Sequence, residues 1–115
     1  MEEIKGENYS VTYDPNNTSV YCKGSFRLRG ADEYDPIITL LTNIVDDEPE
    51  HIILDLRELE FLNSSGINML SKFVINVRKK GSSALTVKGS ESYPWQNKSL
   101  KNLQRLMPNL ELDVQ

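Results

Sequence analysis

The chain has 115 residues, which suits one domain with one ordinary hydrophobic core. Hydrophobic residues make up 38% and charged residues 26% of the chain, a composition that excludes a disordered protein. The net charge of −4 argues against generic nucleic-acid binding, which requires a basic surface.

The first predicted element is a β-hairpin. The segment NYSVTYD (8–14) alternates polar and apolar residues, and TSVYCKGSFRLR (18–29) resumes that pattern. Between them, Pro15 and two asparagines supply a turn. Gly24 inside the second strand indicates a bulge or a close approach of another backbone segment.

A helix follows within GADEYDPIITLLTNIVDDE (30–48). Asp35 is the candidate N-cap, and Pro36 then takes the first helical position. Four apolar residues fall on one face of this helix, namely Ile37, Leu40, Leu41 and Ile44. Pro49 ends the helix or lies just past it.

The next two elements are a strand and a second helix. HIILDL (51–56) is a short apolar run without alternation, which predicts a central strand buried on both faces. After Asn63, apolar residues recur at spacings of three and four at Ile67, Leu70, Phe73, Val74 and Val77. Gly81 stops this helix, and Arg78-Lys79-Lys80 suits the negative end of its dipole.

The last third of the chain predicts a strand and a third helix. SALTVKG (83–89) has the length of a strand, and Ser92 is the candidate cap of the helix that follows. Pro94 lies near its first turn, and its apolar stripe consists of Trp95, Leu100, Leu103 and Leu106. Pro108 lies beyond the helix, and NLELDV (109–114) is either a last strand or a frayed tail.

The order of these elements predicts one α/β domain over residues 1–115. Strand–helix–strand alternation implies parallel pairing with right-handed crossovers, and the hairpin adds an antiparallel part. We therefore expect a mixed β-sheet with an N-terminal hairpin and about three helices.

The sequence also predicts a soluble, cytoplasmic protein that binds no membrane. The N-terminus MEEIKGENYS is acidic and polar, and it shows no secretory signal. The longest apolar run, IITLLTNIV, is broken by Thr and Asn and is too short to span a bilayer. Cys22 is the only cysteine, which excludes an internal disulfide and a cysteine-rich metal site.

Two adjacent serines stand where the strand gives way to the second helix, in FLNSSGIN (61–68). Asn63 or Ser64 can cap the helix, and one such residue is enough for that purpose. A phosphate on Ser64 would lie at the positive end of the helix dipole, where anions are tolerated best. It would add about −1.5 to −2 charges and reverse the local surface charge. These residues therefore suggest a phosphorylation switch.

Catalysis by these serines has little support in the sequence. A nucleophilic serine requires a base within hydrogen-bond reach, and His51, the only histidine, lies at the opposite end of the preceding strand. No phosphate-binding glycine loop and no metal-spaced His or Cys cluster is present in the sequence. Asp55 precedes the serine loop, and we expect it to bond loop amides in a structural role. The sequence predicts no catalytic residue, no metal site and no cofactor.

The segment IILDLRELEFLNSSGINMLSKFVINVRKKGS (52–82) resembles the STAS domains of bacterial anti-sigma factor antagonists, as a divergent subgroup. Their signature is a hydrophobic strand ending in Asp-Leu, a spacer with Phe, then Asp-Ser-Ser-Gly or Asp-Ser-Thr-Gly. The order of the predicted elements also matches that fold for nearly the whole chain. Asn63 stands where the family usually has Asp, and it retains the oxygen that caps the helix.

The resemblance implies a non-enzymatic module in a partner-switching pathway. In that family, an anti-sigma factor that is also a serine kinase with a histidine-kinase-like ATPase fold phosphorylates the first serine, and a PPM-type phosphatase reverses this. The unmodified antagonist binds the kinase and releases the sigma factor. Carried onto this chain, the resemblance gives Ser64 as the phosphorylation site, Ser65 as second candidate and Gly66 as the family glycine.

The expected partner-binding surface comprises Asn63, Ser64, Ser65, Gly66, Asn68 and Met69. The flexible side chain of Met69 suits a docking surface, although its position also fits the core stripe. Two alternative functions remain: a phosphoprotein that regulates a second-messenger enzyme, and a sensor domain for a small ligand such as a nucleotide.

Overall fold

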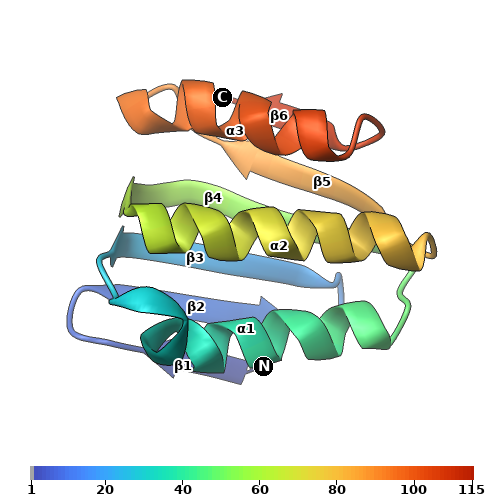
Figure 1. The fold of residues 1–115 in the computed structure, drawn as a ribbon, viewed down its shortest axis with the longest axis horizontal. Coiled ribbons are helices and arrows are strands. Elements are labelled where there is room, and N and C mark those ends of the chain that lie inside the picture. The colour runs from blue at the N-terminus through green and yellow to red at the C-terminus, as the bar shows by residue number, and fades with distance from the viewer. Residues whose placement is uncertain (1) are drawn as a thin grey trace.

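The predicted hairpin forms the antiparallel part of a six-stranded sheet in the structure, a computed structural model that describes residues 2–115. In chain order the elements are β1 (Glu2–Lys5), β2 (Tyr9–Asp14), β3 (Ser19–Phe26), α1 (Gly30–Asp46), β4 (His51–Leu62), α2 (Ser64–Lys80), β5 (Ala84–Gly89), α3 (Pro94–Leu106) and β6 (Glu111–Val114). The strands lie side by side in this same order (Figure 1). The predicted mixed α/β fold is therefore confirmed.

Within the sheet, β2 runs in the direction opposite to the other five strands. β1, β2 and β3 pair antiparallel, whereas β3, β4, β5 and β6 pair parallel. Two of these strands extend the prediction: no strand was predicted at Glu2–Lys5, and NLELDV supplies β6 rather than a frayed tail. Short, charged edge strands such as β1 carry a weak sequence signal because they bury little apolar surface.

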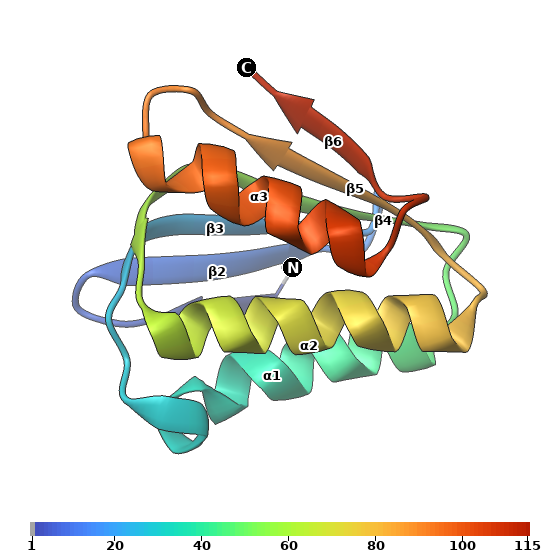
Figure 2. The same ribbon diagram turned by 45° about the horizontal axis from the view of Figure 1, so that its top comes forward.

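All three helices cover one face of the sheet (Figures 1 and 2). The core between the two layers contains Val20, Leu54 and Val87 from the strands and Leu41, Leu70 and Leu100 from the helices. No helix within residues 2–115 covers the opposite face, and His51 and Ile53 of β4 are exposed and half-buried, respectively, so the prediction that β4 is buried on both faces is wrong. That face is polar at β4, where Asp55 and Arg57 alternate with the core residues.

At Gly24, another backbone segment comes close, which is one of the two predicted roles. The backbone oxygen of Asn8 lies against Gly24, where it accepts a hydrogen bond of 2.8 Å from the amide of Ser25. Gly24 has a φ angle of +87°. The register between β3 and β4 also shifts between Gly24 and Ser25, but the extra residue, Glu60, lies in β4, so the bulge is not in the strand of Gly24.

Helix α1 starts earlier than predicted. It begins at Gly30 after Arg29, so Asp35 is not its N-cap and Pro36 lies inside it. The side chain of Glu33 accepts a hydrogen bond from the Arg29 amide, and Tyr34 is fully buried. Burial of the Tyr34 ring holds the extra turn on the sheet, an effect that local cap signals do not reveal.

Helix α3 also differs from the prediction at its start. Its N-cap is Tyr93, which makes no side-chain cap bond, so Ser92 is not the cap, while Pro94 takes the first helical position. Gln96 is completely buried, although the apolar stripe did not include it. Its side-chain nitrogen donates to the oxygens of Leu56 and Leu59, and its oxygen accepts from the Ser90 amide. Gln96 thus joins α3 to β4.

Those bonds matter because β4 is longer than predicted. It has 12 residues, but it pairs with β5 only from His51 to Asp55. Beyond that point, side chains of α3 replace β5 as hydrogen-bond partners of β4. Gln96 donates to the oxygen of Leu56, and the indole N–H of Trp95 donates to the oxygen of Leu59. The second half of β4 is therefore held in place up to the serine loop.

No helix within residues 2–115 is long and apolar enough to cross a membrane.

Cys22 is buried in the core. This burial raises the pKa of its thiol to about 12, so the thiol is unreactive in the folded protein at neutral pH.

Candidate functional site

The two serines lie where the parallel strands end. β4 ends at Leu62, and α2 begins at Ser64 with Asn63 as its N-cap in extended conformation. In Figure 1 the starts of α1, α2 and α3 lie at the same end of the molecule, beyond the carboxyl ends of β3, β4 and β5. This edge is where open α/β sheets place their binding sites.

Asn63 organises the loop through its side-chain amide. Its Oδ1 accepts hydrogen bonds from the Gly66 amide at 2.9 Å and from the hydroxyl of Tyr34 at 2.8 Å. Its Nδ2 donates to the carbonyl oxygen of Leu28 at 2.7 Å. The orientation is fixed, because the Gly66 amide can only donate and the Leu28 carbonyl can only accept. Asn63 therefore ties α2, α1 and the β3–α1 loop together.

We expect the substitution Asn63→Asp, which restores the usual family residue, to lower the free energy of unfolding by about 1–3 kcal/mol. An aspartate carboxylate caps a helix as well as the asparagine amide does, but it cannot donate a hydrogen bond to the carbonyl oxygen of Leu28. Its second oxygen would instead lie against that carbonyl oxygen, and both atoms are acceptors. Urea denaturation at neutral pH measures the loss. Asn68→Asp, a change of the same chemistry at an exposed position of α2, serves as the control. An Asn63→Asp variant as stable as the wild type would contradict this account.

Ser64 is exposed, and Ser65 is half-buried. Because Asn63 caps the helix, neither hydroxyl is needed for that purpose. The Gly66 amide bonds to the Asn63 side chain and the Ile67 amide to the Asn63 carbonyl. No described residue accepts a hydrogen bond from the amides of Ser64 or Ser65, which are the first two amides of the helix. An oxyanion on Ser64 would find these donors beside it.

The other predicted surface residues divide between exposed and buried positions. Asn68 is exposed on α2, whereas Met69 is only 4% exposed and belongs to the core. Gly66 is buried, and an added Cβ would meet the side chain of Leu62 and lie 2.8 Å from the hydroxyl of Tyr34. The lack of a side chain at Gly66 therefore makes room for the side chains of Leu62 and Tyr34.

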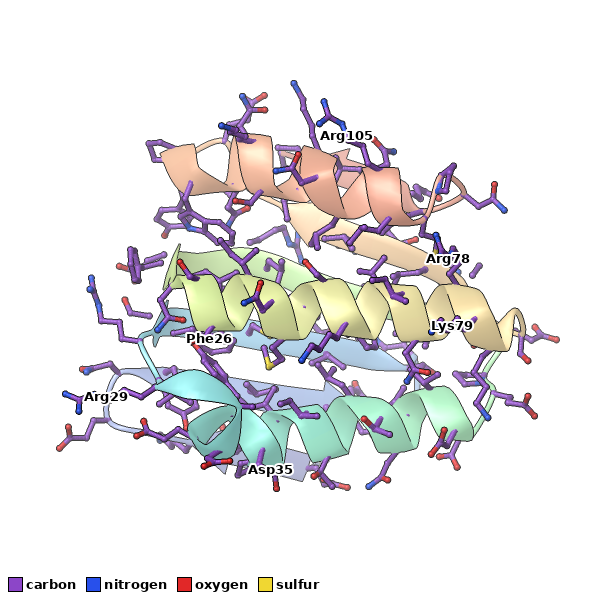
Figure 3. The ribbon with its side chains drawn as sticks, in the orientation of Figure 1. Phe26, Arg29, Asp35, Arg78, Lys79 and Arg105 are labelled. Carbon is purple, nitrogen blue, oxygen red and sulfur yellow. The ribbon has the colours of Figure 1, made fainter. Side chains whose placement is uncertain are left out.

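Two arginines that the sequence reading missed lie next to this loop. The guanidinium of Arg27 stacks over the ring of Phe61 with 4.0 Å between its carbon and the ring centroid. Arg29 follows Leu28, whose oxygen bonds to Asn63, and Figure 3 shows it at the end of the molecule where α2 begins. The first turn of α2 contains no acidic residue. These cations were not apparent because they belong to a different loop in sequence.

Asp55 lies in the middle of β4, not just before the loop. It is 6% exposed and accepts hydrogen bonds from the backbone amide and the guanidinium of Arg57, with 2.7 Å to Nη2. The hydrogen bonds to this carboxylate raise the pKa of Arg57 above its ordinary value. The role of Asp55 is structural, but the expected bonds to loop amides are absent among residues 2–115, because the strand continues seven residues beyond it.

The structure does not bring His51 and Ser64 together. His51 begins β4 and bonds to the hydroxyl of Thr86 at 2.7 Å, whereas Ser64 follows the far end of that strand. Within the described residues, no group of three or more His, Cys, Asp or Glu side chains is placed to hold a metal ion.

Comparison with known families gives one match, and it covers this site. The model of the STAS domain family matches residues 34–91, which include β4, the serine loop and α2. No sequence of a curated protein matches the chain.

Solved structures of Pseudomonas aeruginosa proteins share the fold over the whole chain. A chain in the crystal structure of the diguanylate cyclase SiaD in complex with its activator SiaC gives a TM-score of 0.76 at 12% identity, with 100% of both chains covered. A structure of SiaC gives 0.73 at 14% identity, covering 100% of this chain and 98% of that one. The structure of apo-SiaC gives 0.74 at 11% identity, covering 100% and 99%. Identities this low establish a common fold alone.

Proposed function

Because this chain belongs to the STAS domain family, we propose that it is a non-enzymatic regulatory module that binds a protein partner and is switched by phosphorylation of Ser64. The observation that carries the proposal is the position of Ser64. Its side chain is exposed at the start of α2, while Asn63 performs the capping that the fold requires. A modified Ser64 hydroxyl would thus leave the helix cap intact.

The surroundings of Ser64 favour a phosphate. The two unpaired amides and the positive end of the helix dipole attract an anion, and no acid in the first turn opposes it. Arg27 and Arg29 add positive charge from the neighbouring loop. A phosphate would reverse the charge of this surface and hinder a partner that packs against it, by repulsion and by desolvation. Ser65, one residue further and half-buried, is the second candidate.

The proposed partner-binding residues act in two ways. Ser64, Ser65 and Asn68 offer polar side chains for contact with a partner. Asn63 and Gly66 are occupied by internal contacts, so they shape the loop that the partner meets. Met69 is almost completely buried, and it lines both cavities between α1 and α2.

Two classes of partner agree with this module. The family implies an anti-sigma factor that is also a serine kinase, together with a PPM-type phosphatase. The whole-length likeness to SiaC, the activator of a diguanylate cyclase, favours a second-messenger enzyme as the regulated partner. We place the second-messenger enzyme first for that reason, and sigma-factor control is the alternative output.

A direct test installs phosphoserine at position 64 by genetic code expansion, with phosphoserine at position 82, exposed beyond the far end of α2, as the matched control. Binding to purified candidate partners, a diguanylate cyclase and an anti-sigma kinase encoded near this gene, is measured by calorimetry. We expect unmodified protein to bind one of them and phosphoserine at position 64 to weaken that binding at least about tenfold, or 1.4 kcal/mol. Equal affinity of the modified and unmodified forms would refute the switch, and the partner that binds decides between the two outputs.

A further inference from the structure

Cavities lie along both interfaces between neighbouring helices. Between α2 and α3, the side chains of Ile67, Leu70 and Leu103 line a cavity of about 10 Å³. Between α1 and α2 lie two adjoining, larger cavities of about 250 Å³ and about 230 Å³, which share Ile38, Met69 and Lys72. Together these two cavities form a surface groove, which we call the α1–α2 groove.

The α1–α2 groove is apolar with a cationic edge. Ile38 and Leu41 of α1 face Met69 and Phe73 of α2, and all four line the larger cavity. Lys72 is the only charged residue that lines either cavity. The groove follows α2 from Ser65 to Asn76, or about 17 Å at 1.5 Å per residue.

Two lysines lie on the α2 edge of this groove. Lys72 and Lys79 are seven residues apart, so they lie on the same side of α2 about 10 Å from each other. Both are exposed, and neither forms an ion pair with a described residue, whereas neighbouring Lys80 pairs with Asp46 at 3.7 Å. Figure 3 shows Lys79 at the far end of α2, away from the serine loop. An occupant with acidic groups would supply the missing counter-charges.

We infer that the α1–α2 groove binds an amphipathic, acidic helix of the protein partner. Apolar side chains at helical spacing enter between α1 and α2, and acidic residues pair with Lys72 and Lys79. An open groove several turns long suits a helix better than a small ligand, which binds in pockets that enclose most of its surface. This inference rests on the function proposed above, since it names the part of the partner that docks.

The groove also reaches the proposed switch. Ser65 and Tyr34 line its cavity nearest the serine loop, and the Tyr34 hydroxyl bonds to Asn63. Ser65, Lys72 and Lys79 follow one another at intervals of seven residues along the same edge of α2. A phosphate at Ser64 places negative charge at the end of this edge, where it repels an acidic helix.

The test uses a displayed library of helical peptides of about 14 residues, or about four turns, selected against the full-length unmodified protein. The peptides carry varied apolar residues at one face and either glutamate or lysine beside it. Binding of the selected peptides is followed by titration and through the methyl NMR signals of Met69 and Met107. Met69 reports on the groove, and Met107, which follows α3, is the internal control.

Glutamate-bearing peptides should be enriched and should shift the Met69 signal while leaving that of Met107 in place. Lys72→Glu should weaken their binding at least about tenfold, since it replaces an attraction with a repulsion. Lys98→Glu, the same change at an exposed position of α3, should leave affinity within about twofold. Phosphoserine at position 64 should weaken peptide binding in the same direction as Lys72→Glu.

Enrichment of lysine-bearing peptides, no enrichment at all, or an unchanged affinity of Lys72→Glu would overturn the inference. Titration with decanoate provides a further arm: a Met69 shift with decanoate and none with any peptide would identify a small-ligand pocket, against the inference. The two proposals fail separately. If the groove binds no helix, phosphorylation of Ser64 can still release a partner, and if phosphoserine has no effect, peptide binding in the groove stands.

Discussion

The substitution Gln96→Leu is expected to lower the free energy of unfolding by about 3 kcal/mol. Gln96 is 0% exposed. Its Nε2 donates hydrogen bonds of 2.7 and 3.0 Å to the oxygens of Leu56 and Leu59, and its Oε1 accepts one of 2.8 Å from the Ser90 amide. Leucine fills a similar volume but leaves Leu56 and Ser90 without these partners inside the protein. A buried unpaired backbone group costs about 1–3 kcal/mol, which outweighs the added apolar surface.

Urea denaturation followed by circular dichroism measures this loss, and Gln104→Leu is the matched control. Gln104 is half-buried on the same helix and makes one bond, of 3.2 Å, to the oxygen of Leu110. Its replacement should cost about 1 kcal/mol or less. Similar losses for the two variants would show that Gln96 has no special role in joining α3 to the second half of β4.

The second large effect is expected at Gly24, where replacement by alanine should cost about 3 kcal/mol. A side chain at positive φ costs roughly 1–2 kcal/mol, and overpacking adds about 1–3 kcal/mol. The added Cβ would meet the backbone oxygen of Asn8, which cannot withdraw without breaking its hydrogen bond from Ser25. The pairing of β3 next to Gly24 and the turn between β1 and β2 would be disturbed together.

Gly30 offers a control that separates the two contributions. Its φ of +63° is also positive, but an added Cβ would have nothing within 4 Å. Gly30→Ala should therefore cost only the conformational term, about 1–2 kcal/mol. Denaturation midpoints of the two variants give the comparison, and equal destabilisation would mean that the approach of Asn8 contributes nothing.

Where the sequence prediction failed, a distant part of the chain was responsible. Helix α1 begins six residues before Pro36 because Tyr34 is buried against the sheet and bonded to Asn63, which is 29 positions away. Gln96 is polar and interrupts the apolar stripe of α3, yet it is buried because β4 offers it carbonyl groups that β5 no longer pairs. Neither partner can be identified from local propensity.

The candidate site shows the same division. The cap at Asn63, the helix that follows it and the exposure of Ser64 agree with the pattern of residues 61–68. The bond from Asn63 to Leu28 was not foreseeable, and it gives the asparagine a role that an aspartate cannot fill. The arginines of the β3–α1 loop and the groove between α1 and α2 arise only when separate elements meet.

The sequence by itself determined the N-terminal hairpin, the parallel pairing implied by strand–helix–strand alternation, the apolar faces of the three helices and the helix start that carries the serines. These features follow from periodicity, turn residues and caps, which act over a few neighbouring positions. Only the tertiary structure decided which face of the sheet the helices cover, which polar side chains are buried, and where cavities lie between the helices. Such features depend on how surfaces far apart in the chain fit together, and that fit is a property of the packed molecule.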